Sequence, residues 1–132
     1  MREFNIKIIS TQGTFMEDKI EEIKLKDLDG KFSILSNHEA RVVFIVPCRG
    51  EVVRKSSRET LFLSFGILNV DENGDVLITC EACEWKKDID INRSKKSKER
   101  ALNRIDKNKD GIDIQRAEKA LMRALARIES VS

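Results

Sequence analysis

The sequence predicts a β+α fold, in which an N-terminal antiparallel β-sandwich (residues 1–85) is followed by a C-terminal antiparallel two-helix hairpin (residues 86–132). All six Phe, the single Trp and five of the six Gly lie in the first part, and these types favour strands and turns. The net charge changes from −4 (11 basic, 15 acidic groups) to +6 (14 basic, 8 acidic groups) at the same boundary. The second part is rich in the helix formers Ala, Leu, Lys, Arg and Glu, and it contains an internal repeat.

Short apolar segments with a period of two mark the strands of the first part. The alternation begins at Phe4, Ile6 and Ile8, and further apolar segments lie at 23–25, 32–34, 42–46, 52–53, 61–63, 67–70 and 76–80. Turn signals separate these segments, and Asn73 followed by Gly74 between two apolar runs is a strong hairpin signal. About eight strands at this spacing indicate an antiparallel sandwich or barrel rather than βαβ units.

The repeat predicts two helices, at about 90–106 and 112–130, because residues 89–105 match residues 112–128 with an offset of 23. Each copy opens with an Asp suited to a helix N-terminus, and residues 107–111 predict a tight connector. The second copy carries a narrow apolar stripe: Ile114, Ala117, Leu121, Ala124 and Ile128. The matching stripe of the first copy is polar in its middle: Ile91, Ser94, Lys98, Ala101 and Ile105. A seam this weak predicts a hairpin that is folded or docked only conditionally.

The sequence lacks a constellation for catalysis or metal binding. Cys80 and Cys83 form a CxxC that ends a β segment, where residues three apart point to opposite faces, so we expect core thiols rather than a redox or zinc pair. Residues 106–111 open like a calcium-binding loop, but Ala117 stands where that loop needs Glu. His38 has no obvious nucleophile beside it in sequence. We therefore expect no metal site, no required cofactor and no enzymatic activity.

Composition also indicates the compartment and excludes some partners. The longest apolar run, Val42–Val46, is far shorter than the roughly 20 residues of a membrane span, and no charged-then-apolar leader opens the chain. Three cysteines without a leader are typical of reduced thiols in a cytoplasm. The basic second part lacks aromatic residues and interleaves Lys and Arg with Asp and Glu, which favours a solvated face over nucleic-acid binding.

Three short segments match the motifs of one family, in order and at that family's spacing. Residues 29–38 agree with a Gly-Glu-Leu-Gly-Ile-Leu-Pro-Gly-His stretch at Gly30, Ile34, Leu35 and His38. Residues 64–70 read Ser-Phe-Gly-Ile-Leu-Asn-Val, close to Ser-Gly-Gly-Phe/Ile-Leu-Glu-Val, and residues 88–94 are similar to an Ile/Leu-Asp-x-x-Arg-Ala motif. Together these segments resemble the epsilon subunit of bacterial F-type ATP synthases.

The resemblance implies a non-catalytic rotor subunit in the central stalk of a rotary enzyme. Its sandwich would bind the gamma subunit and the ring of c subunits, coupling ion translocation to ATP synthesis. Its movable hairpin would reach toward the alpha/beta catalytic head and inhibit ATP hydrolysis. Such a chain would lie at the cytoplasmic face of the cell membrane, held there through partner subunits. The interface residues implied by alignment are Ser10, Gly30, Lys31, His38 and Val43.

The resemblance also implies that the folded-down hairpin could bind ATP as a regulatory ligand that is not hydrolysed. The candidate residues are Glu84, Ile89, Asp90, Arg93, Arg100, Arg123 and Arg127. On the sequence, the arginines of the two helices would face each other across the seam, and a polyphosphate would neutralise their repulsion. Surface arginines on a solvated helix are the alternative interpretation. For the whole chain, the alternative is a free-standing interaction module whose basic hairpin binds an unrelated protein or nucleic acid.

Overall fold

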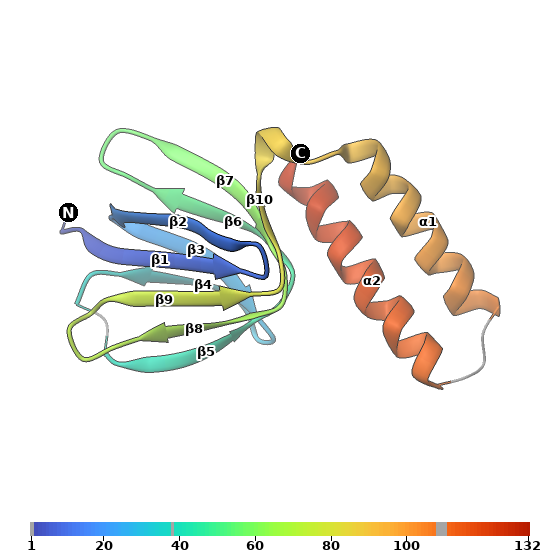
Figure 1. Cartoon of the computed structure of the whole chain (residues 1–132), viewed down its shortest axis with the longest axis horizontal. Coiled ribbons are helices and arrows are strands. Elements are labelled where there is room, and N and C mark those ends of the chain that lie inside the picture. The colour runs from blue at the N-terminus through green and yellow to red at the C-terminus, as the bar shows by residue number, and fades with distance from the viewer. Residues whose placement is uncertain (1, 38, 108–110) are drawn as a thin grey trace.

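The computed structural model describes residues 2–37, 39–107 and 111–132, and it confirms the predicted fold class (Figure 1). Two five-stranded sheets face each other, with strand orders β2-β1-β9-β8-β5 and β10-β7-β6-β3-β4. The first sheet contains β1 (Phe4–Ser10), β2 (Gly13–Ile20), β5 (Arg41–Ile45), β8 (Gly66–Val70) and β9 (Val76–Cys80). The second contains β3 (Glu22–Asp27), β4 (Gly30–Leu35), β6 (Cys48–Val53), β7 (Arg58–Leu63) and β10 (Cys83–Trp85).

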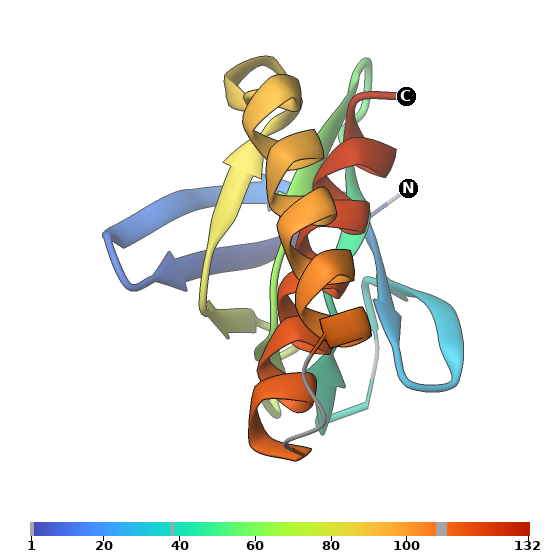
Figure 2. The ribbon, with the colours of Figure 1, turned by 90° about the vertical axis from the view of Figure 1, so that its right-hand side faces the viewer.

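A short 3-10 turn, η1 (Lys86–Asp88), leads from the sandwich to the helices α1 (Ile91–Lys107) and α2 (Gly111–Ser130). The helix α2 lies between the sandwich and α1, and the two helices run antiparallel side by side (Figures 1 and 2). His38 and the centre of the expected connector, residues 108–110, lie outside the described residues. None of the described helices is both long and apolar enough to cross a membrane.

One strand pair departs from the expected antiparallel pattern. β1 pairs with β9 in parallel, with Ile6 opposite Val76, whereas the other pairs of the described sheets are antiparallel. Turn signals between neighbouring segments predict antiparallel hairpins, but they say nothing about strands that are far apart in the chain. The sequence alone therefore does not determine whether β1 and β9 pair in parallel or antiparallel.

The strand β2 has no counterpart among the predicted segments, because most of its side chains are polar and exposed. Its pairing with β1 contains a β-bulge: Ile8 lies opposite Met16 and Ile9 opposite Thr14, so that Phe15 is the extra residue. The Phe15 ring packs against Trp85, with the ring centroids 4.8 Å apart. The bulge thus places an aromatic contact beside the start of the hairpin domain.

The hairpin signal at Asn73 and Gly74 is confirmed, since β8 and β9 are antiparallel neighbours. Gly74 has a φ of +82°, in the region that favours glycine. The Asp71 carboxylate accepts hydrogen bonds from the backbone N–H groups of Asn73 (2.8 Å) and Asp75 (3.0 Å). These bonds satisfy the backbone of the turn.

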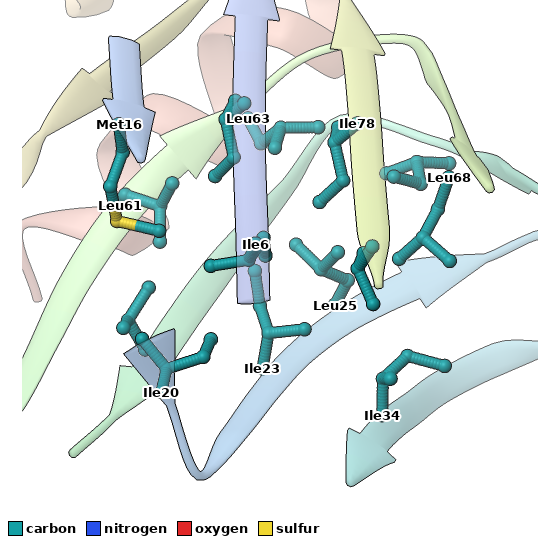
Figure 3. Packing of buried hydrophobic residues seen from close by; sticks show 14 of the residues in the cluster. Ile6, Met16, Ile20, Ile23, Leu25, Ile34, Leu61, Leu63, Leu68 and Ile78 are labelled. Atoms are coloured by element: carbon teal, nitrogen blue, oxygen red, sulfur yellow. The ribbon is translucent and has the colours of Figure 1, made fainter. Parts of the chain in front are cut away.

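The hydrophobic core lies between the two sheets (Figure 3). Its fully buried members include Ile8, Ile20, Ile23, Leu61 and Ile78. Every described residue of this cluster belongs to the sandwich, and none comes from α1 or α2. The sandwich therefore has a core of its own, independent of the hairpin.

The seam between α1 and α2 consists of small buried side chains: Ser94, Ala101, Ala117 and Ala124. These belong to the two predicted stripes. The Asp90 carboxylate accepts a hydrogen bond from the Arg93 backbone N–H (3.0 Å), as an N-cap does. The Ser94 hydroxyl donates to the Asp90 carbonyl (3.0 Å), so this seam hydroxyl is satisfied.

Candidate functional site

A second face of α2, beyond the predicted stripe, docks the hairpin on the outer side of β6 and β7. Ala126 and Ser130 are buried on this face, and the Ser130 hydroxyl donates to the Ala126 carbonyl (2.7 Å). Arg123 and Arg127, at (i, i+4) spacing, also point toward the sandwich, where each meets a carboxylate. The apolar stripe in the sequence predicts only the face of α2 that packs on α1. The second buried face, which contacts the sandwich, was not predicted.

Arg127 contacts both a carboxylate and an aromatic ring. Its Nε donates to Glu84 Oε1 (2.7 Å), and its guanidinium carbon lies 4.3 Å from the centroid of the Phe62 ring. Phe62 is 0% exposed but stands outside the core cluster, because Leu61 and Leu63 on either side of it point inward. The docked helix therefore covers an aromatic ring that would otherwise face water.

Arg123 forms a fork with Glu81. Arg123 Nε and Nη2 donate to the two Glu81 carboxylate oxygens at 2.7 and 2.9 Å, and the Ser64 hydroxyl donates to Glu81 Oε1 (2.7 Å). The hydrogen bond from Arg123, followed by that from Ser64, holds the pKa of the Glu81 carboxyl below its ordinary value. Glu81 is thus a charged anchor for the hairpin.

A cleft of about 530 Å³ opens where the sandwich, η1 and both helices meet. Six of the predicted site residues line it: Ser10, Glu84, Asp90, Arg93, Arg123 and Arg127. Arg100 instead lines a separate depression on the outer side of α1, and its Nη2 donates to Ser97 Oγ (3.1 Å). Ile89 lies beside η1 and does not line the cleft. The structure therefore brings together most, but not all, of the predicted ATP residues.

The expected arrangement of two arginine pairs facing each other across the seam is wrong. Small side chains fill the seam, whereas Arg123 and Arg127 turn toward Glu81 and Glu84. Arg93 is exposed at the mouth of the cleft. Arg123 and Arg127 therefore each already have a carboxylate partner, which offsets the repulsion expected between them.

The expectation that Cys80 and Cys83 point apart is also wrong. Cys80 ends β9 and Cys83 begins β10, which belongs to the opposite sheet, so the chain turns between them and the rule for one continuous strand does not apply. Both side chains face the core: Cys80 belongs to the core cluster, where its Sγ donates to the Ile9 carbonyl (3.6 Å), and Cys83 packs against the cluster. The neighbouring Cys83 lowers the pKa of Cys80, and the neighbouring Cys80, together with burial, raises the pKa of Cys83.

The expected interface residues occupy different parts of the sandwich. Gly30 (φ +124°) and Lys31 follow the turn between β3 and β4, whose tip carries Leu28, 86% exposed. Val43 packs against the core and is half-buried, whereas Phe44 next to it is 66% exposed. Because side chains alternate along β5, the exposed apolar residues are Val42 and Phe44, on either side of the expected interface residue Val43.

Several residues at this site were not predicted from the sequence. Glu81 and Phe62 hold α2, although neither stands in a recognisable motif. One signal was available: Glu81 and Glu84 are three apart, and Arg123 and Arg127 are four apart. Such spacings are common in charged helices and turns, so they do not by themselves indicate that these residues pair.

Two family models match the chain, one for each part. The model described as "ATP synthase, Delta/Epsilon chain, beta-sandwich domain" matches residues 3–86, and "ATP synthase, Delta/Epsilon chain, long alpha-helix domain" matches residues 87–131. The sandwich and the hairpin of the structure correspond to these two descriptions.

Curated relatives are named as epsilon chains, in agreement with the two family models. The "ATP synthase epsilon chain" of Clostridium novyi is 43% identical over 111 residues, covering 83% of each chain. That of Clostridium acetobutylicum is 43% identical over 104 residues, covering 76% of this chain and 77% of the relative. The "ATP synthase epsilon chain, sodium ion specific" of Acetobacterium woodii is 35% identical, covering 77% of each.

Solved structures share the fold at low sequence identity. A chain in the cryo-EM structure of the Euglena gracilis mitochondrial ATP synthase (OSCP/F1/c-ring) matches with a TM-score of 0.86 at 18% identity, covering 98% of this chain and 82% of that chain. A chain of the Tetrahymena thermophila central stalk/c-ring structure matches with a TM-score of 0.69 at 10% identity, covering 99% and 98%. With both family models in place along the sequence and relatives at 43% identity over most of their length, the chain belongs to the ATP synthase delta/epsilon chain family, as an epsilon chain.

Proposed function

We propose that the chain is a non-catalytic rotor subunit in the central stalk of an ATP synthase, where it couples ion translocation to ATP synthesis. The solved structures that share its fold support this role, since one is an ATP synthase OSCP/F1/c-ring assembly and the other a central stalk/c-ring assembly. The single observation that carries the proposal is the two-part form of the chain: the sandwich has its own core, and the hairpin is docked on its surface through two ion pairs and one covered ring. Such a chain would join the cytoplasmic face of the membrane only through partner subunits.

The outer face of the first sheet is the proposed contact with the gamma subunit. Phe44 and Ile67 are directly opposite each other on β5 and β8, and both are exposed. Val42 and Leu77 extend this exposed apolar patch, and a patch of this kind on an otherwise charged chain marks a protein interface. The exposed Leu28, beside Gly30 and Lys31, is the proposed contact with the c-subunit ring.

A binding measurement tests the gamma contact. We expect Phe44→Asp to weaken binding to purified gamma subunit at least tenfold, because a charge would be buried in an apolar interface. The control Lys55→Glu changes an exposed charge in the turn between β6 and β7 and should leave the affinity unchanged. If Phe44→Asp binds like the parent chain, the interface assignment is wrong. A chain that does not bind gamma at all would favour the free-standing interaction module instead.

We further propose that the hairpin controls ATP hydrolysis by leaving the sandwich and extending toward the alpha/beta head. The docked hairpin shares no core with the sandwich, and two partly exposed ion pairs and one covered ring hold it. Each ion pair contributes about 1 kcal/mol and the covered ring about 1.5–3 kcal/mol, so docking can be reversed at a cost of a few kcal/mol.

We also propose the cleft as the site of a regulatory ATP. Its volume of about 530 Å³ falls in the range of small-molecule pockets. Arg93, Arg123 and Arg127 line it, and guanidinium groups bind phosphate oxygens through forked hydrogen bonds. Because both helices and the sandwich contribute to its walls, a ligand held there would stabilise the docked state.

A further inference from the structure

A second hollow lies on the outer face of the second sheet, apart from the cleft. This groove has a volume of about 340 Å³, and its walls come from β3, β4, β6 and the last turn of α2. Figure 2 shows the β-hairpin of β3 and β4 beside α2. The charged side chains that line the groove are four cations and two carboxylates: Lys24, Lys26, Lys31, Arg49, Glu51 and Glu129. None of these residues lines the cleft, so the groove is a separate site with an excess of positive charge.

The strand order brings three of these cations together. β3 lies between β4 and β6, and Lys26 on β3 is paired directly with Lys31 on β4. Arg49 on β6 is exposed on the same face, because its strand neighbours Cys48 and Gly50 are buried. Like charges directly opposite each other destabilise a sheet. This arrangement therefore costs stability unless a negative group lies over it.

The nearby carboxylates leave these three cations without an ion pair. Glu51 already accepts a hydrogen bond from Arg58 (2.9 Å), and its next cation is Lys24, at 4.0 Å. Among the described residues, no carboxylate forms an ion pair with any of the three. The groove thus has room for an anion, and its cations are available to hold one.

We propose that this groove binds a phosphate-bearing anion, held by Lys26, Lys31 and Arg49. Ammonium and guanidinium groups bind phosphate oxygens, Lys as a point charge and Arg as a fork. The volume of the groove is at the lower end of the range of small-molecule pockets, which fits a pyrophosphate or a phospholipid headgroup. The site shares no lining residue with the ATP cleft, and it does not rest on the proposed role of the chain in a central stalk.

Glu129 makes the site sensitive to the position of α2. Its carboxylate is exposed on the wall that α2 contributes, so it repels an anion in the groove. The C-terminal end of α2 also carries the negative end of the helix dipole. By reciprocity, an anion in the groove and the last turn of the docked α2 disfavour each other. The effect is opposite to that of ATP in the cleft, which would stabilise the docked state.

A titration of the full chain with inorganic pyrophosphate, followed by NMR of the backbone amides, tests the site. We expect saturable shifts in residues 24–33 and 48–51, which added salt weakens because the cations are exposed. Lys26→Gln/Lys31→Gln should lower the affinity about tenfold or more, since it removes two charge-assisted contacts. The matched control Lys55→Gln/Lys119→Gln removes two exposed charges elsewhere and should leave the affinity nearly unchanged. Shifts confined to the cleft, or equal affinity in the two double variants, would overturn the proposal.

A single substitution tests the opposition between the anion and α2. Glu129→Gln should raise the pyrophosphate affinity about threefold, because it removes a repulsive charge from the wall of the groove. Since Glu129 is exposed, this change leaves the fold intact. An affinity that is unchanged or lower would refute the repulsion by α2.

Sedimentation with lipid vesicles identifies the source of the anion. Vesicles of phosphatidylcholine mixed with phosphatidylglycerol offer headgroup phosphates with a net negative charge, and vesicles of phosphatidylcholine alone are the control. Binding to the mixed vesicles that is lost in Lys26→Gln/Lys31→Gln assigns the groove to a lipid headgroup. Pyrophosphate binding without vesicle binding assigns it to a free phosphate. A chain that binds neither refutes the site.

Discussion

At the scale of single residues, Arg127 joins the two parts of the chain through two different interactions. Its guanidinium contacts the Glu84 carboxylate and the face of the Phe62 ring at the same time. An ion pair with partly exposed partners is weak by itself, but the ring excludes water from one side of it. Arg127 is therefore the residue whose loss should affect docking most directly.

We expect Arg127→Ala to loosen the hairpin by about 1–2 kcal/mol, through loss of the ion pair and of the cation–π contact. Hydrogen exchange of α2 would report this as faster exchange at the C-terminal half of the helix. The matched control is Arg116→Ala, which removes an exposed arginine from the same helix. Equal exchange in the two variants would show that Arg127 is not an anchor.

Docking should also depend on pH through Glu81. The hydrogen bond from Arg123 lowers the pKa of Glu81 below its ordinary value of 4.5. Its contribution is therefore fully present above that value and is lost as the pH falls through the lowered pKa. We expect α2 exchange to accelerate at acidic pH in the parent chain, beyond the intrinsic trend. In Glu81→Gln this excess should vanish, and an excess that persists there would assign the effect to another group.

At the scale of elements, the sequence predicts some features of the chain and misses others for identifiable reasons. The seam positions Ser94 and Ala117 follow from a local period of three and four residues, which the helix itself enforces. The fork between Arg123 and Glu81 joins residues 42 apart, and no local pattern carries that information. Phe44 is exposed and Val43 packs against the core. Because every residue of the run 42–46 is apolar, its pattern does not show which alternate side chains face the core.

The sandwich should fold without the hairpin. We expect a chain that lacks residues 88–132 to give a β-type circular dichroism spectrum and to unfold cooperatively, because its core is complete. Its midpoint should fall by several degrees, since removal of α2 exposes Phe62, worth about 1.5–3 kcal/mol of burial. A Phe62→Ser change in the truncated chain should cost little further stability. A truncated chain without a cooperative transition would show that the two parts depend on each other.

At the scale of the whole molecule, the cleft joins elements from both parts. We expect ATP to bind the isolated chain and to slow exchange in α2, because its phosphates would bridge both helices and the sandwich. The Arg123→Ala/Arg127→Ala double variant should lose ATP binding in isothermal titration, whereas Arg104→Ala/Arg116→Ala should retain it. Arg100→Ala should have little effect, because Arg100 does not line the cleft. Parent-like ATP binding by the first double variant would place the nucleotide elsewhere.

The parallel pair of β1 and β9 has a consequence for the synthesis of the chain. β1 lies between β2 and β9 in its sheet, and the residues that it brings together, such as Asn5 and Asp75, are 70 apart. A ribosome adds about 5–20 residues per second, so after Ile20 the hairpin of β1 and β2 waits roughly 3–12 s with one edge unpaired, until Cys80 completes β9. An unpaired strand edge is a template for aggregation. The nascent chain therefore needs protection of that edge until Cys80 has emerged.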